Sequence, residues 1–428
     1  MCGIIAINTS NNFRYNIKKS LKEIKHRGPD DEGVFYSSKN DCQLGHVRLS
    51  IIDISNNGHQ PMFSKNNRYV ISYNGEIYNY LELKKYLKSK YDLGFKTKTD
   101  TEVIIEGFSI EKTTFLDKLN GIFSFCIYDT LTENMYVLRD PLGIKPLFYT
   151  KQNNAVFFCS ELKGLTCING LNKQISYNSF ADQLAFMYVP EKNTIYKNFK
   201  KVRPGFCYVY NNGNKVKSYK LFKKLDQKYS FQDENELKNK LTSEFENSVK
   251  RQLISDAPVS LFLSGGLDSS AIAYYATKNS NVVNSAYTIS YNKDDLKKDQ
   301  QSDDLKYAKI ISNQLDIKLN VIEAKDDFLN LLPEIIKYME DGFFDPASIN
   351  TYLISKAARD NGIKVMISGQ GADEYMCGYR RYLAEKWIGN IPKIFRYPIS
   401  KLLNYSEDII PESKNSLRRR LLRISKLL

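Results

Sequence analysis

The sequence offers a candidate nucleophile at its start, because Cys2 directly follows Met1. Removal of Met1 would place a free α-amino group on the residue that carries the thiol. Such an amine has a reference pKa of about 7.7–8.0, so a useful fraction is neutral near pH 7 and can act as a base. Residues whose own N-terminus supplies the base are known acyl-transfer nucleophiles. A cysteine at this position can equally be an ordinary buried thiol.

A second chemical signal is SGGLDSS at residues 264–270, between an expected strand and an expected helix. Gly265 and Gly266 allow the backbone to approach an anion closely, and the helix start offers free N–H groups and the positive end of its dipole. The spacing lacks the Lys-Ser/Thr pair of a P-loop and the GxGxxG pattern of a dinucleotide site. The segment predicts a pyrophosphate-binding loop, although a glycine-rich helix start capped by serine would look similar. Its hydroxyl donors are Ser264, Ser269 and Ser270.

A third segment, SGQGADE at residues 368–374, follows the β-prone run IKVMI. It should lie at the carboxyl end of a neighbouring parallel strand and face the same crevice as the first loop. Asp268 and Asp373, with Glu374 as a further candidate, are suited to hold Mg²⁺, because hard cations prefer carboxylate oxygens.

Two kinds of scaffold are needed to position these groups. Residues 1–210 alternate short β-prone runs with Gly, Asn and Asp turn signals, interrupted by helical patterns near 80–88 and 100–107. The polar, Lys- and Asn-rich residues 211–232 are the expected linker. From residue 233 to 428, a helix followed by alternating strands and helices predicts an α/β domain with a parallel sheet. The expected N-terminal strands are 4–7, 69–73, 123–129, 134–139 and 155–159.

Composition limits the functions to consider. The 428 residues include 62 Lys plus Arg and 48 Asp plus Glu, a net charge of +14, with 42% hydrophobic residues. This length predicts two domains and could accommodate three, and the hydrophobic fraction is ordinary for well-cored domains. No apolar run is long enough to span a membrane. Seven scattered cysteines do not suggest a disulfide framework, so we expect a cytoplasmic protein. No recognition motif accompanies the charge, so we expect no nucleic-acid partner.

Only residues 416–428 concentrate the positive charge, with leucine and isoleucine at helical spacing between the basic residues. This segment could contact anionic lipid. We expect instead that it packs on a missing part of the protein or on a partner, which could be a second copy of the chain.

The N-terminal half carries an ordered set of motifs that, together with MCGI, resembles the glutaminase domain of N-terminal-nucleophile amidotransferases, specifically the asparagine synthetase branch. The resemblance implies an α+β fold of αββα layers and hydrolysis of glutamine, with Cys2 forming a γ-glutamyl thioester. His26, in the first motif, is interpreted as structural. The motifs are HRGPD (26–30), HVRLSIID (46–53), GHQPM (58–62), YNGEIYN (73–79), TKTDTEVI (97–104) and RDPLGIKPLFY (139–149).

The same resemblance assigns the groups around the thiol. Asn74 and the backbone N–H of Gly75 would contact glutamine and form the oxyanion hole, since both are uncharged donors. Arg48 would pair with the α-carboxylate of glutamine, and Glu76 and Asp100 would offset its α-ammonium charge. Taken singly, these residues could instead be a turn at Asn74–Gly75, a helix cap at Asp100 and a surface ion pair at Arg48.

The SGGxDS pattern resembles the signature of ATP pyrophosphatases, which cleave ATP between the α- and β-phosphates and adenylylate an acceptor oxygen. The resemblance implies ATP and Mg²⁺, with Asp268 and Asp373 as metal ligands. The expected ATP-binding residues are Leu263, Ser264, Gly265, Gly266, Asp268, Ser269, Ser270, Ile289, Ser368 and Gly369.

Two differences from the asparagine synthetase pattern affect the expected acceptor. Gln370, in the expected acceptor and ammonia site with Asp373, stands where the family normally carries Glu, and an amide cannot take a proton from ammonia. Aspartate is the default acceptor, and a sugar or cell-envelope precursor carboxylate is the alternative. The family's Arg-x-Pro-Phe-Leu-Asp stretch and catalytic Lys are not found after CGYRRY (377–382), so we expect a truncated ligase, one completed by a partner, or a chain that retains only glutaminase activity.

Overall fold

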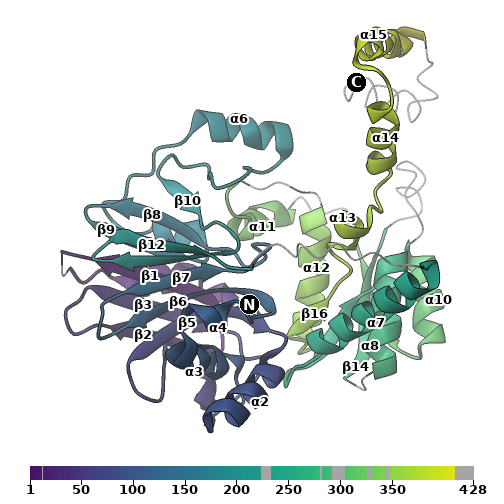
Figure 1. Ribbon diagram of the computed structural model, residues 1–428. Coiled ribbons are helices and arrows are strands. Elements are labelled where there is room, and N and C mark those ends of the chain that lie inside the picture. The colour runs from purple at the N-terminus through teal and green to yellow at the C-terminus, as the bar shows by residue number, and fades with distance from the viewer. Residues whose placement is uncertain are drawn as a thin grey trace. The chain divides into compact units, whose positions relative to one another are not determined.

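The computed structural model describes residues 1–11, 13–222, 233–279, 282–291, 304–324, 330–342, 345 and 347–409 (Figure 1). The basic segment 416–428 lies outside these residues. The chain divides into two compact units, which are described separately. The first comprises Met1–Gly266 with Ser270–Ile367, and the second comprises Leu267–Ser269 with the residues from Ser368 onward.

Two six-stranded antiparallel sheets form the N-terminal half of the first unit. The first sheet has the order β10-β8-β9-β1-β3-β2, and the second β12-β11-β7-β6-β5-β4. The strands of the first sheet are β1 Gly3–Thr9, β2 Asp31–Tyr36, β3 Cys42–Arg48, β8 Phe148–Gln152, β9 Ala155–Cys159 and β10 Phe199–Lys201. Those of the second are β4 Met62–Phe63, β5 Tyr69–Ile77, β6 Gly121–Asp129, β7 Met135–Arg139, β11 Phe206–Asn211 and β12 Asn214–Lys220.

The two sheets share an apolar layer, in which Ile4 and Leu44 of the first sheet join Val70 and Val137 of the second. The opposite face of each sheet is also buried, because alternate strand residues point to opposite faces. Helices α1 (Ile17–Glu23) and α5 (Leu162–Thr166) cover the first sheet, and α2 (Tyr80–Tyr91), α3 (Asp100–Glu111) and α4 (Thr113–Leu116) cover the second. The predicted helix–sheet–sheet–helix architecture and its N-terminal strands are confirmed.

The predicted linker begins too early. Residues 214–220 form β12, which pairs with β11 at the edge of the second sheet. Polar composition suggested a linker because an edge strand is solvated and often carries Lys, as β12 does at Lys215 and Lys217. Residues 223–232 of the same segment lie outside the described residues.

A four-stranded parallel sheet of order β15-β14-β13-β16 forms the other half of the first unit, as predicted. Its strands are β13 Val259–Phe262, β14 Val283–Ser290, β15 Lys318–Glu323 and β16 Val365–Ile367. The loop 264–270 follows β13 and the loop 368–374 follows β16, so both loops begin at the same edge of the sheet. The associated helices are α7 Glu234–Gln252, α8 Leu267–Asn279, α10 Asp304–Gln314, α11 Leu332–Tyr338 and α12 Ala347–Asp360.

The second unit contains the first three residues of α8 and the helices α13 (Ala372–Met376), α14 (Arg380–Gly389) and α15 (Lys393–Ile409). In the described part of the chain, no helix combines the length and the apolar character that crossing a bilayer requires. All seven cysteines are free thiols, as expected.

Candidate active sites

Cys2 lies immediately before β1 and contacts the chain that leaves β3. The Leu49 N–H donates to Cys2 Sγ over 3.4 Å, and the Arg27 Nε–H donates to the Cys2 carbonyl oxygen over 2.9 Å. Burial raises the pKa of the Cys2 thiol, so its resting form is the neutral thiol. A base must therefore take the proton before the sulfur can attack a carbonyl carbon.

The terminal amine of the chain lies in surroundings that favour a neutral base. Burial lowers the pKa of the Met1 α-amine to about 5, and the nearby cations Arg27 and Lys145 lower it as well. Removal of Met1 would transfer the terminus to Cys2, which lies close to the same Lys145. The self-activated cysteine stays a prediction, and the local electrostatics favour it.

Asn74 and Gly75 lie inside β5, so the alternative that they form a turn is wrong. The Asn74 side chain is fully buried, and neither its Oδ1 nor its Nδ2 has a hydrogen-bond partner among the described residues. An unpartnered buried amide costs about 1–3 kcal/mol, a cost that bound substrate would remove. A Cβ at Gly75 would lie 2.3 Å from the Ile122 carbonyl oxygen, so pairing of β5 with β6 requires glycine there.

Asp100 is the first residue of α3, but Thr99 caps that helix by accepting the Glu102 N–H. The Asp100 carboxylate turns inward, where Oδ2 accepts the Tyr73 hydroxyl over 2.6 Å and the Ile77 N–H over 3.0 Å. Burial raises the pKa of Asp100. Burial and the neighbouring Asp100 also raise the pKa of Glu76. The carboxyl groups of Glu76 and Asp100 repel each other when both are charged. A bound ammonium group would relieve that repulsion, so the pair is suited to receive one.

Arg48 is buried at the end of β3, so the alternative of a surface ion pair is wrong, and it forms no ion pair within the part of the chain that the structure describes. Its Nη1 donates to the Ser55 carbonyl oxygen over 2.8 Å, and Nη2 donates to the carbonyl oxygens of Ile52 and Asp53. Gly58 leaves room for the guanidinium, since a Cβ there would lie 1.9 Å from Nη2. Backbone carbonyls therefore hold the orientation of the Arg48 side chain, and its positive charge helps to lower the pKa of the nearby Asp30, Asp31 and Asp53.

Two basic side chains near Cys2, those of Arg27 and Lys145, belong to motifs of the sequence that do not by themselves show their role. Arg27 joins the Cys2 carbonyl to the Glu161 carboxylate, which its Nη1 meets at 2.7 Å. Lys145 is buried near Glu76 and Cys2, and burial lowers its pKa. Both residues occur in quoted motifs, HRGPD and RDPLGIKPLFY, but a motif does not show which side chains converge. His26 also bonds Glu161, at 3.0 Å, which fits the structural role expected of it.

The residues of the loop 264–270 that belong to the first unit have the backbone that its glycines suggest. Gly265 has a φ of +77°, and a Cβ there would lie 2.5 Å from the Ala308 nitrogen, so glycine is required. The Ser264 hydroxyl accepts the Gly266 N–H over 3.3 Å. The buried Ser270 hydroxyl has no partner among the described residues. Leu263 is buried beside this loop, and Ile289 is half-buried in β14.

In the second unit, Asp268 lies against the loop 368–374. A Cβ at Gly369 would be 3.0 Å from the Asp268 Cβ and 3.3 Å from the Ser269 nitrogen. Burial raises the pKa of Asp268, and the charges of Asp373 and Glu374 raise it further. Ser368 and Gln370 are exposed in this loop.

These carboxylates suit a hard cation, which prefers oxygen ligands. No group of three or more His, Cys, Asp or Glu side chains in the described ranges is arranged as a closed metal site. Mg²⁺ usually binds through one or two carboxylates and takes its other ligands from phosphates and water.

The chain thus joins a two-sheet sandwich, which has a cysteine immediately before its first strand, to a parallel sheet with a glycine-rich loop after its strand β13. The family model described as a glutamine amidotransferase domain matches residues 1–220, and the model described as asparagine synthase matches residues 240–426. The chain belongs to the glutamine-hydrolysing asparagine synthetase family.

Two relatives illustrate the match. Glutamine-hydrolyzing asparagine synthetase 1 of Bacillus subtilis (strain 168) is 32% identical over 422 residues, which cover 96% of this chain and 64% of that protein. A putative glutamine-hydrolyzing asparagine synthetase 2 of Methanocaldococcus jannaschii is 34% identical over 427 residues, 94% of this chain and 81% of that protein. The chain thus spans less than two thirds of the length of the first relative.

Proposed function

We propose that this chain is a glutamine-dependent carbon–nitrogen ligase of the asparagine synthetase type, with a glutaminase domain that ends with β12 at residue 220 and a synthetase domain at residues 233–428. The observation that carries the glutaminase half is the buried, unpartnered amide of Asn74, on the strand that packs against the strand that follows Cys2. The match of residues 240–426 to asparagine synthase supports the synthetase half.

In the glutaminase reaction, the Cys2 α-amine takes the thiol proton, and Sγ attacks the side-chain carbonyl carbon of glutamine. The Asn74 amide and the Gly75 N–H donate to the oxyanion that forms. The C–N bond then breaks, the amine returns the proton to the departing nitrogen, and ammonia leaves. Water hydrolyses the thioester to glutamate. Arg48 binds the α-carboxylate of glutamine, while Glu76 and Asp100 bind its ammonium group.

In the synthetase reaction, an oxygen of the acceptor carboxylate attacks the α-phosphorus of ATP and pyrophosphate leaves. Ammonia attacks the activated carbonyl carbon, and AMP leaves. The N–H groups of the loop 264–270 and its serine hydroxyls orient the phosphates. Asp268 and Asp373 would hold Mg²⁺, which supplies positive charge against the departing pyrophosphate when it is bound.

Aspartate is the acceptor that we propose. A sugar or cell-envelope precursor carboxylate is the second candidate, because Gln370 replaces a carboxylate that could take the proton of ammonia. An exposed amide at this position can donate hydrogen bonds to a hydroxylated acceptor as well as accept them.

The deciding experiment measures AMP release with ATP, Mg²⁺ and either glutamine or ammonium, in the presence of aspartate or of candidate sugar acids. We expect AMP only with the correct acid, and we expect Cys2→Ala to abolish the glutamine-dependent reaction while leaving the ammonium-dependent one. Glutamate formation without AMP for any acid would reduce the function to that of a glutaminase. Equal loss of both nitrogen sources in Cys2→Ala would contradict the division of labour between the two domains.

A further inference from the structure

The loop that follows β3 is held by the parallel-sheet half of the first unit. The Asp53 N–H donates to Asp256 Oδ2 over 2.8 Å, and the Asp256 N–H donates back to the Ile51 carbonyl oxygen over 3.0 Å. Asp256 lies three residues before β13, the strand that leads into the nucleotide loop. Asp256 therefore accepts one hydrogen bond from Asp53, 203 positions earlier in the chain, and donates another to Ile51 of the same loop.

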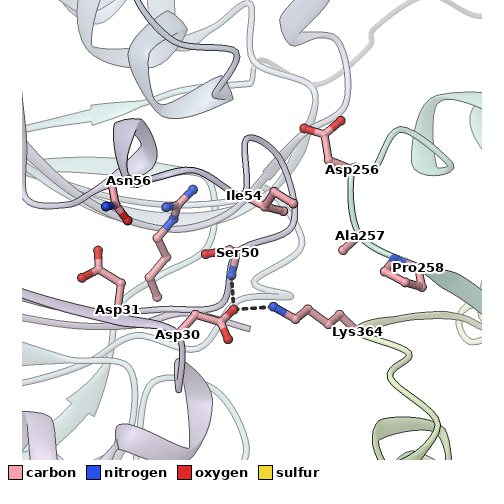
Figure 2. Close-up of a pocket in the computed structure, with 10 residues that line it drawn as sticks. Asp30, Asp31, Ser50, Ile54, Asn56, Asp256, Ala257, Pro258 and Lys364 are labelled. Atoms are coloured by element: carbon pink, nitrogen blue, oxygen red, sulfur yellow. Dashed lines mark hydrogen bonds and ion pairs between the residues drawn. The ribbon is translucent and has the colours of Figure 1, made fainter.

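A second tie lies beside the first. Asp30 Oδ2 accepts both the Ser50 N–H and the Lys364 Nζ, each over 2.8 Å, and Lys364 directly precedes β16. Figure 2 shows Asp256, Ala257 and Pro258 on one side of a pocket and Ile54, Asn56 and Ser50 on the other, with Lys364 reaching Asp30. The pocket has a volume of about 390 Å³. The hydrogen bonds of Asp256 and the ion pair of Lys364 with Asp30 join the two halves of the first unit at its walls.

Asp53 connects the Asp256 hydrogen bond to the proposed glutamine site. Its carbonyl oxygen accepts from the Arg48 guanidinium, and its Oδ2 accepts the Lys98 N–H over 2.9 Å, two residues before Asp100. Its φ of +54° is uncommon for a residue with a side chain, so its contacts must hold this conformation. The groups assigned to the carboxylate and the ammonium of glutamine are thus both connected to Asp53.

We propose that Asp256 is a positioning residue for glutamine binding: its carboxylate fixes the backbone of Asp53, and Asp53 in turn fixes the direction of the Arg48 guanidinium. This inference rests on the proposed assignment of Arg48 to the α-carboxylate of glutamine. Asp256 itself touches neither the nucleophile nor the oxyanion donors in any contact that the structure shows. Its loss should therefore weaken substrate binding and spare the chemical step.

Asp256→Ala removes the acceptor oxygen, whereas Asp256→Asn removes the charge and keeps an acceptor. Asp360→Ala is a matched control, because it removes an exposed carboxylate at the end of α12 that takes part in none of the contacts named here. We expect the KM for glutamine to rise about three- to tenfold in Asp256→Ala, the usual effect of one lost hydrogen bond. We expect kcat to stay within about twofold in this variant, and Asp256→Asn and Asp360→Ala to keep the wild-type KM.

Calorimetric titration of glutamine into Cys2→Ala and into Cys2→Ala/Asp256→Ala measures binding without turnover, and the dissociation constant should rise by the same factor. An unchanged KM in Asp256→Ala, in a protein whose wild type does hydrolyse glutamine, would overturn the inference. So would an equal rise in KM in Asp256→Asn, because that variant keeps the acceptor. Failure of the wild type to bind or hydrolyse glutamine would instead overturn the proposed function.

Discussion

The Tyr73 hydroxyl donates to Asp100 Oδ2 over 2.6 Å, joining strand β5 to the first residue of helix α3 inside the buried core. The next residue after Tyr73 is Asn74, so one short segment supplies both an expected oxyanion donor and the support of an expected ammonium site. The carboxylate needs that support, because burial raises the pKa of Asp100 and hydrogen bonds from Tyr73 and Ile77 oppose the rise.

Tyr73→Phe should raise the KM for glutamine about fivefold or more, since a hydrogen bond to a charged group contributes about 1.5–3 kcal/mol. The pKa of Asp100 should rise further in this variant, so the KM defect should grow as the pH falls. Steady-state glutaminase kinetics over a series of pH values measure this. Tyr128→Phe is the matched control, because it removes a buried 2.7 Å hydrogen bond to Asp41, and its KM should not change. Equal KM shifts in the two variants would contradict the role of Tyr73.

Asn74→Ala should lower the kcat of glutamine hydrolysis about 10²–10³-fold with little change in KM, as loss of an oxyanion donor does. Its free energy of unfolding should stay the same or rise by up to about 1–3 kcal/mol, because the substitution removes a buried amide that has no partner among the described residues. Denaturant unfolding and single-turnover kinetics separate the two effects. A large loss of stability with unchanged kcat would make Asn74 a structural residue.

Asp268→Asn should reduce AMP formation about a hundredfold or more, because metal-assisted charge stabilisation contributes several kcal/mol. Glutamate release by the same variant should be unchanged. The Mg²⁺ concentration for half-maximal AMP formation should also rise, which a general folding defect would not produce. Loss of glutaminase turnover in parallel would show that the substitution disturbs the whole chain.

His46 should make folding stability depend on pH. Its ring is fully buried and bonds the Tyr73 carbonyl oxygen over 3.0 Å, and burial lowers its pKa from 6.5 to about 3. Below pH 6.5 the unfolded chain binds a proton at this histidine that the folded chain does not bind. Stability from His46 is therefore complete above about pH 6.5 and is lost as the pH falls towards 3.

At pH 5.5 the expected loss from His46 is about 1.4 kcal/mol relative to pH 7.5. Denaturant unfolding of the wild type and of His46→Gln at the two pH values tests this. The His46→Gln variant should be less stable than the wild type at both pH values. Its stability should fall less between pH 7.5 and 5.5, by about 1.4 kcal/mol. Identical pH dependences would show that His46 is protonated in the folded protein.

Local sequence was sufficient to predict the two scaffolds and the placement of their loops. Period-two runs in the first half and the strand–loop–helix order in the second are short-range patterns, and they depend on backbone geometry that each segment carries by itself. The role of Gly265 could be predicted for the same reason, because close backbone approach and a positive φ admit few other residues. The edge strand β12 was missed, because its polar composition also fits a linker.

Tertiary structure decided which of these groups meet. Nothing in HVRLSIID shows that Arg48 points at three backbone carbonyls, or that Asp53 contacts Asp256 in the other half of the chain. Such contacts join residues that are distant along the chain, and they depend on how sheets and helices pack against one another. Residue types alone predicted a nucleophile at Cys2 and an anion-binding loop at 264–270. The buried amide of Asn74, which has no partner among the described residues, depends instead on two packed sheets that exclude water around it.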